Sequence, residues 1–350
     1  MPFDPAKMIR RLFAIFVLIG AAWVSHERPA AAAELTVGAR ERLLVVAPHP
    51  DDETLGAGGL VQRVLERGGA VRVVLVTAGD GYVEAVVHDT GQPKPRPAQY
   101  IAYGERRLRE ARAAMRKLGA DKVRLQLLGF PDGGLTPLLN ADWQRTHPER
   151  SRTTGASDSP YREAVDPDVG YDGADLRREL LRLLREAQPT IVVLPHPLDR
   201  HPDHRATGIF TLLAIDEWIG HRATPRIAAP ELLAYLVHWP DWPPGWNAAT
   251  PVPESSRATL ELPQDFPALK SHFTALVLTD EEIATKRAAL GAYQSQQEEM
   301  ASLLAAFVRR TEPFVRLTST DVGEVGHLIG AANRTRKDVR RTEGHGAPVP

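Results

Sequence analysis

Short apolar runs and longer amphipathic segments alternate along much of this chain. Four short segments predict strands, three of them nearly continuous runs of branched apolar residues, at residues 43–47, 71–77, 123–127 and 190–194. Runs of this kind are typical of parallel strands that are buried on both faces of a sheet. A mostly parallel sheet is therefore expected.

Longer amphipathic segments predict helices at residues 56–66, 103–118, 176–187 and 280–309. The last of these has its N-cap at either Thr279 or Asp280. The order strand, helix, strand, helix, strand predicts an α/β fold with a three-layer, doubly wound, mostly parallel sheet of the Rossmann-like type. Inserted loops are expected over the carboxyl edge of this sheet.

Three segments lie outside the regular pattern. Residues 137–175 are polar and rich in turns, which predicts a loop insertion that shapes a substrate cleft. Residues 79–99 form a similar loop. Residues 239–246 form an aromatic, proline-rich turn, whose rings could either pack in the core or stack on a sugar.

The two ends of the chain differ from the rest. Basic residues, an apolar run over residues 12–24 and small residues over 30–33 predict a secretory signal peptide at residues 1–33. The apolar run is shorter than the ~20 residues needed to span a bilayer, although an uncleaved anchor remains the alternative. Residues 34–332 are expected to form a single domain, and residues 333–350 an unfolded tail.

Composition narrows the classes of function. The 44 acidic and 43 basic residues nearly cancel, so no strong field attracts nucleic acid, and contact with a membrane is expected only through the N-terminal segment, if that segment is uncleaved. The chain has no cysteine, so any metal must be held by nitrogen and oxygen ligands. The oligomeric state is left open.

Two turns carry histidines and carboxylates directly after predicted strands. The turn PHPDDE places His49 three residues before Asp52, so that an imidazole and a carboxylate can converge, with Asp51 beside them. The turn DRHPDH repeats this spacing with His201 and His204. A single turn of this kind is more often a capped loop, but two of them, at the ligand-binding edge of one sheet, favour a metal site.

A zinc site with two histidines and one carboxylate leaves one position open for water. We therefore predict His49, Asp52 and His204 as the ligands, with His196 as the rival ligand. Asp51 is the predicted general base, because it lies beside the metal without being needed as a ligand.

Two further residues of the second turn have predicted roles. His201 could face the carbonyl oxygen, donating a hydrogen bond to the oxyanion or a proton to the leaving amine. Asp203 would orient a histidine from behind.

Together the motifs PHPDDE and HPDH resemble those of the PIG-L/LmbE-like zinc-dependent N-acetylglucosaminyl deacetylases. The sequences GERRLREARAAMRKLG and LGFPDGGL resemble the family's helix before its third strand and the loop after that strand. The resemblance implies the same zinc ligands, base and oxyanion or acid residue. It also implies that Asp132 and an arginine of the helix, Arg107 rather than Arg106, contact substrate hydroxyls.

The resemblance implies hydrolysis of the N-acetyl group of a glucosamine-type sugar or glycoconjugate. Family members that act on small thiol precursors or membrane-anchor glycolipids work in the cytosol or at the reticulum. The predicted signal peptide instead indicates an exported protein, periplasmic or extracellular, or one anchored and facing outside the cytoplasm. The alternatives are a zinc amidase acting on another N-acyl small molecule and a non-catalytic carbohydrate-binding protein.

Overall fold

A computed structural model of the chain describes residues 33–139, 143, 148–220, 229–246, 258–267, 272–318 and 320–322. Apart from Ala33, the predicted signal peptide lies outside these residues, as does the predicted tail. The division into leader, domain and tail therefore stays a prediction. Within the described ranges, no helix is both long and apolar enough to cross a membrane.

Five parallel strands form the centre of the sheet. They are β2 (Arg42–Ala47), β3 (Ala70–Thr77), β4 (Val123–Phe130), β5 (Ile191–Pro195) and β6 (Glu231–Tyr235). Their spatial order is β4, β3, β2, β5, β6, because the chain moves outward from β2 and then returns to the other side of β2. This order confirms the predicted doubly wound sheet. It also places the reversal of winding between β2 and β5, the position where such folds bind ligands.

Three more strands extend the sheet beyond β6. Strand β8 (Thr311–Leu317) runs antiparallel to both β6 and β7 (Phe273–Val277), and β1 (Ala33–Glu34) pairs in parallel with β7. The described sheet therefore has eight strands. None of the strands β6, β7 and β8 was predicted from the sequence.

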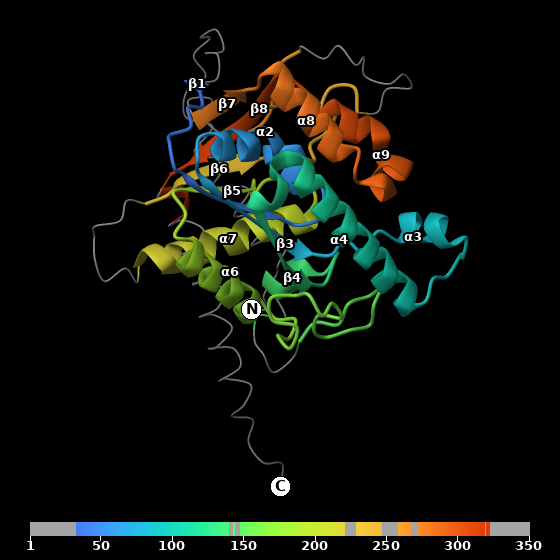
Figure 1. The fold of residues 1–350 in the computed structure, drawn as a ribbon. Helices are drawn as coiled ribbons and strands as arrows, with labels where there is room; N and C mark the ends of the chain where they lie inside the picture. Colours follow the sequence, from blue (N-terminus) through green and yellow to red (C-terminus); the bar gives the residue numbers. More distant parts are fainter. Residues whose placement is uncertain are drawn as a thin grey trace.

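Helices cover both faces of the sheet (Figure 1). Helices α2 (Asp52–Glu66), α4 (Pro97–Gly119) and α8 (Asp280–Leu290) pack together on one face, and α6 (Gly173–Ala187) packs with α7 (Pro202–Gly220) on the other. Helix α6 buries one leucine-rich stripe, whereas α7 is apolar around most of its surface and is buried accordingly. The predicted three layers are confirmed.

Two predicted segments differ from the structure. The expected loop at residues 79–99 contains the helix α3 (Val83–Thr90), and α4 begins within that segment, at Pro97. The expected single helix at residues 280–309 is two helices, α8 and α9 (Gln294–Ala306). The N-cap of α8 is Thr279, whose side chain accepts the backbone N–H of Glu282.

The inserted segment at residues 137–175 lies along the outer strand β4. The backbone N–H of Val165 donates to the carbonyl of Leu127 in β4, and the Tyr171 hydroxyl donates to the Gly129 carbonyl. The described part of the segment therefore covers a sheet edge that would otherwise be open.

Helix α2 is bent at Ala57, whose φ of −145° is not helical. The bend frees two backbone N–H groups, of Gly59 and Leu60, and both donate to the Glu312 carboxylate of β8. Lys286 of α8 donates to Glu312 and to the Leu55 carbonyl. A buried ion pair therefore joins the two halves of α2 and supports the turn that precedes this helix.

Candidate metal and catalytic site

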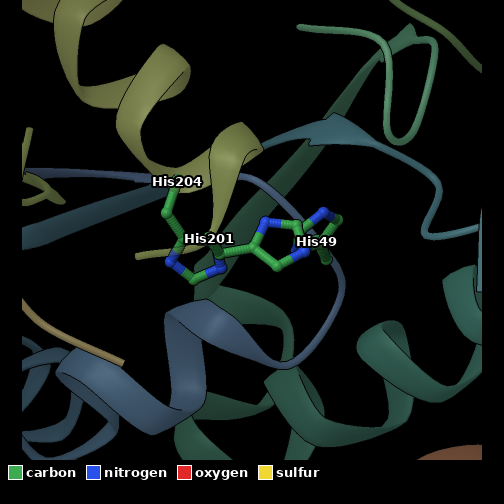
Figure 2. Close-up of side chains that lie close together, drawn as sticks. All are labelled: His49, His201 and His204. Carbon is green, nitrogen blue, oxygen red and sulfur yellow. The ribbon is translucent and has the colours of Figure 1, made fainter. Parts of the chain in front are cut away.

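The two histidine turns meet at the reversal point of the sheet. His49 follows β2, and His201 and His204 stand just before and within the first turn of α7, which follows β5. Figure 2 shows the three imidazoles close together. Their ring centroids are 4.9 to 5.4 Å apart. The expectation that turns far apart in the sequence converge is therefore confirmed as geometry.

The three predicted metal ligands lie in contact. One oxygen of Asp52, Oδ2, is 3.1 Å from Nδ1 of His49 and 3.1 Å from Nε2 of His204. His204 is fully buried, and neither of its ring nitrogens has a hydrogen-bond partner in the described part of the chain. Buried polar atoms are rarely left unpaired. Nε2 of His204, which lies 3.1 Å from the Asp52 oxygen, therefore fits a cation held between the two groups.

Charge supports this interpretation. Burial alone would raise the pKa of Asp52, but the positive charges of protonated His204 and His49, with the hydrogen bond from His49, lower it well below its ordinary value. The carboxylate is therefore ionised, as a metal ligand requires.

His201 is a third imidazole at the same point. One nitrogen each of His49, His201 and His204 lies within 4.8 Å of the others, so His201 could also reach a shared cation. Its Nδ1 accepts the backbone N–H of Asp203 at 3.2 Å. In the neutral ring the proton therefore sits on Nε2, which can donate a hydrogen bond. Burial, with the neighbouring histidines, lowers the pKa of His201 to about 2, which favours this neutral form.

Asp51, the predicted base, is buried and has a φ of 124°. Its backbone N–H donates to Oε2 of Glu53 at 3.0 Å, and Glu53 in turn accepts the hydroxyl of Tyr293. Burial raises the pKa of Asp51 to about 8, while the adjacent Arg107 opposes this rise. The site therefore holds the Asp51 side chain in a fixed orientation beside the guanidinium of Arg107.

Arg107 is buried and lies against the motif. Its guanidinium donates to the carbonyls of Pro50 and Gly79, at 2.7 and 2.9 Å, and to the Asp51 carboxylate at 3.2 Å. Gly79 has a φ of +69°, and any side chain there would collide with Arg107. Arg106 instead makes ion pairs on the surface, so the structure places the predicted arginine, and not its neighbour, at the site.

Asp132, the other predicted substrate contact, reaches the opposite side of His49. Its Oδ1 lies 3.1 Å from Nε2 of His49, and its Oδ2 accepts the backbone N–H of Gly81 at 2.6 Å. Asp203 also approaches His49, at 3.5 Å, and accepts the N–H of Gly133. Both carboxylates therefore fix the loop after β4 against the first histidine turn.

Two residues of this site were missed or discounted in the sequence analysis. Asp199 lies 3.5 Å from His204 and 3.3 Å from His238, and it also accepts backbone N–H groups of Val237 and His238. His238 was not among the predicted site residues, yet its ring lies 4.5 Å from that of His204. The signal was present, because His238 follows the apolar run of β6 as His49 follows that of β2.

The rival ligand His196 lies apart from this cluster. Its ring packs edge-on against Phe266, and its Nδ1 accepts the N–H of Leu198. Burial lowers the pKa of His196 to about 4, so the ring is neutral. Two further histidines that were not among the predicted site residues, His147 and His221, lie outside the described residues.

A pocket of about 300 Å³ opens over the site. His49, Asp51, Asp132 and His201 line its base. Its outer wall comes from the α3 region and from α9, with side chains that the sequence analysis did not assign to the site: Tyr82, Glu84, Gln296, Met300 and Leu303.

The segment at residues 137–175 had been expected to shape this cleft, but none of its described residues lines the pocket. The segment instead contacts Asp80, which accepts a hydrogen bond from the hydroxyl of Tyr161. In the aromatic turn, Trp239 and Trp242 pack in the core against Phe266 and Phe307, which confirms the core alternative for these two rings.

Known proteins that are similar to this chain in sequence or in fold include several deacetylases. Residues 44–215 match the family PIG-L, described as GlcNAc-PI de-N-acetylase. The chain is 27% identical over 255 residues to 1D-myo-inositol 2-acetamido-2-deoxy-alpha-D-glucopyranoside deacetylase 2 of Saccharopolyspora erythraea, a match that covers 72% of this chain and 82% of that protein. It is 32% identical over 180 residues to the corresponding deacetylase of Mycobacterium sp. (strain KMS), a match that covers 50% of each chain. Among solved structures, N,N'-diacetylchitobiose deacetylase from Pyrococcus horikoshii is similar at 17% identity with a TM-score of 0.46, covering 91% of this chain and 94% of that one.

Proposed function

Since residues 44–215 of this chain belong to the PIG-L family, we propose that the protein is a metal-dependent deacetylase that hydrolyses the N-acetyl group of a glucosamine-type sugar. The relatives named above are deacetylases of acetamido sugars, which supports the reaction class. The proposed bond is the amide between the sugar nitrogen and the acetyl carbonyl.

One observation carries this proposal. A single oxygen of Asp52 lies 3.1 Å from a ring nitrogen of His49 and 3.1 Å from a ring nitrogen of His204, at the floor of a pocket. These donors are nitrogen and oxygen atoms, the set expected for zinc in a chain without cysteine. We propose zinc as the native metal on this ground, with His49, Asp52 and His204 as its ligands.

When bound, a divalent cation makes water easier to deprotonate and polarises the amide carbonyl. Asp51 is placed at the pocket to take a proton from the attacking water and to deliver it to the sugar nitrogen as the C–N bond breaks. Arg107 favours the ionised form of Asp51, which a base requires. His201 can donate from Nε2 to the carbonyl oxygen as negative charge develops there.

Asp132 and Arg107 both line the pocket but have different contacts there. Asp132 lines the pocket and can accept a hydrogen bond from a sugar hydroxyl, as proposed from the family resemblance. Arg107 also lines the pocket, but its described hydrogen bonds go to Asp51 and to two backbone carbonyls. We therefore propose that Arg107 acts mainly by orienting Asp51 and by favouring its ionised form.

The experiment that tests the function uses the purified protein, stripped of metal and reloaded with zinc. Zinc content and acetate release from N-acetylglucosamine and its glycosides are measured for the wild type, His204→Ala and His196→Gln. We expect one zinc per chain and turnover in the wild type and in His196→Gln, and loss of both in His204→Ala. A zinc-free wild type, or turnover that survives in His204→Ala, would contradict the proposal.

We also propose that the protein is exported, because the first residues have the order of a secretory signal peptide. An anchored form that faces outside the cytoplasm is the alternative. Fractionation of cells that produce the full chain, with mass spectrometry of the mature N-terminus, tests this. A product retained in the cytosol with residue 1 intact would contradict it.

A further inference from the structure

The outer wall of the pocket is built by parts of the chain that do not carry the two histidine turns. Tyr82 and Glu84 come from the start of α3, and Met300 and Leu303 come from α9. Helix α9 lies beyond residue 215, where the family match ends. The α9 side of the wall therefore lies outside the matched residues, whereas Tyr82 and Glu84 lie within them.

The wall is fixed in place by ion pairs on its outer side. Arg106 of α4 pairs with Asp89 of α3 and with Glu298 of α9, and His88 of α3 pairs with Glu299 of α9. Each exposed pair contributes little alone, but together they join three helices. The side chains on the inner side of the wall are therefore held over the site before any substrate enters.

The charged side chains that line the pocket are mainly acidic. Asp51, Asp52, Asp132 and Glu84 line it, and Arg107 is the only lysine or arginine among its described lining residues. Arg107 is already hydrogen-bonded to Asp51 at the base of the pocket. No cation in the described structure pairs with Glu84, so its carboxylate is available at the outer wall.

Tyr82 lies close enough to two carboxylates to be affected by their charge. Burial raises the pKa of its phenol, and the charges of Glu299 and Glu84 raise it further. These two carboxylates therefore act on the same point, from α9 and α3 respectively. Met300 stands beside them, at a bend in α9 where its φ is −142°, and its flexible apolar side chain can adapt to the face of a bound group.

We propose that the outer part of this pocket selects, through Glu84, substrates whose group attached to the N-acetylated sugar carries an amine, and that it disfavours a phosphate there. This inference rests on the proposed function, since it concerns the group next to the reacting sugar. A phosphate would meet Glu84 with no unpaired lysine or arginine in the described lining to receive it, whereas an ammonium group would find a carboxylate without a described cationic partner.

The test uses three β-glycosides of N-acetylglucosamine that differ in one terminal group: 2-aminoethyl, 2-hydroxyethyl and 2-phosphoethyl. kcat/KM is measured with the zinc-loaded wild type, Glu84→Gln and Glu84→Lys. Glu281→Gln is the matched control, because Glu281 is also exposed in the first turn of a helix but does not line the pocket. All measurements are made at low and at high salt.

We expect the wild type to prefer the amine over the phosphate. Glu84→Gln should lower the ratio of the two kcat/KM values about two- to fivefold, the size expected for one exposed charge pair. Glu84→Lys should lower it further, and Glu281→Gln should leave it unchanged. The preference should also weaken at high salt, because exposed charges are screened.

Two results separate this inference from the proposed function. If the hydroxyethyl glycoside is hydrolysed but the amine to phosphate ratio is the same in wild type and Glu84→Gln, the charge selection is wrong while the deacetylase function stands. If no glycoside is hydrolysed, the proposed function fails, and calorimetric binding of the three glycosides still tests the selection. Equal affinities for amine and phosphate would then overturn it.

Discussion

The backbone of Asp51 has a conformation that side chains other than glycine rarely adopt. A φ of 124° costs about 1–3 kcal/mol and persists only where the surroundings enforce it. Here Glu53 accepts the Asp51 N–H, and Arg107 contacts its carboxylate. The orientation of the predicted base is therefore enforced from both its backbone and its side chain.

The role of Asp51 as base predicts a specific loss. Asp51→Asn keeps the size of the side chain but removes the proton acceptor, so kcat should fall by about a hundredfold or more. Zinc content should stay at the wild-type value, because Asp51 is not a predicted ligand. Acetate release and metal analysis measure the two quantities. The exposed Asp121→Asn serves as the control, and full activity in Asp51→Asn would exclude this residue as the base.

Tyr293 is predicted to position the base through Glu53. Its hydroxyl donates to Glu53, which holds the Asp51 backbone. Tyr293→Phe should therefore lower kcat about tenfold, while KM and zinc content change little. A tenfold loss corresponds to about 1.4 kcal/mol of activation free energy, the size of one well-placed hydrogen bond.

The matched control for Tyr293 is Tyr171→Phe. Tyr171 is also buried and donates one hydrogen bond, to the Gly129 carbonyl, so both variants should lose about 1 kcal/mol of stability. Only Tyr293→Phe should lose kcat. If both variants lose kcat equally, Tyr293 supports stability alone.

The sequence predicts those site residues that lie close together along the chain, and it misses those that come from distant parts of the chain. His49, Asp51 and Asp52 stand in one six-residue turn, so their spacing alone indicates a shared site. Tyr293 reaches Glu53 across 240 residues of chain, and nothing in its local sequence marks that contact. His238 is intermediate, since only the position of β6 in the sheet brings it to His204.

Elements follow a similar division. Strands β2, β3 and β5 were predicted because central parallel strands are buried on both faces and so read as continuous apolar runs. Strand β8 contains Glu312, whose burial depends on Lys286 and on the bent helix α2, so its pattern does not mark a buried strand. Helix α3 has only eight residues and is held by ion pairs with α4 and α9, which local sequence does not reveal.

The ion pair behind α2 makes a prediction about stability. Lys286→Met would leave the Glu312 charge buried without its partner, so the free energy of unfolding should fall by about 3–5 kcal/mol. The double variant Lys286→Met/Glu312→Gln should be less destabilised than this single variant. It leaves no buried charge, and the glutamine can still accept an N–H of the bent helix. Urea unfolding followed by circular dichroism measures both.

The control for this pair is Arg310→Met. Arg310 pairs with an exposed carboxylate, that of Asp280, and its loss should cost less than about 1 kcal/mol. A double variant as unstable as Lys286→Met would show that the charge itself is not the cause.

For the whole molecule, the segments outside the doubly wound core complete the site. The family match, residues 44–215, covers the strands and turns that carry the predicted metal ligands. Strand β8 and helices α8 and α9 then brace α2 and close the pocket, and the segment at residues 137–175 covers β4. The pocket over the histidine turns is therefore closed in part by residues beyond the family match.

The contact between the inserted segment and the core predicts how stability varies with pH. Burial, together with the charge of Asp132, raises the pKa of Asp80 to about 7 from 3.8, and Tyr161 of the inserted segment donates to this carboxyl group. Between about pH 4 and pH 7 the folded protein thus holds a proton that the unfolded chain has released. The contribution of Asp80 to the free energy of unfolding therefore falls as pH rises through this window, by about 4 kcal/mol at most.

Asp80→Asn keeps a hydrogen-bond acceptor for Tyr161 but cannot titrate, so the free energy of unfolding of this variant should change less with pH. Urea unfolding of both proteins from pH 4.5 to 7.5 measures the difference, and parallel curves would show that Asp80 titrates normally in the folded chain.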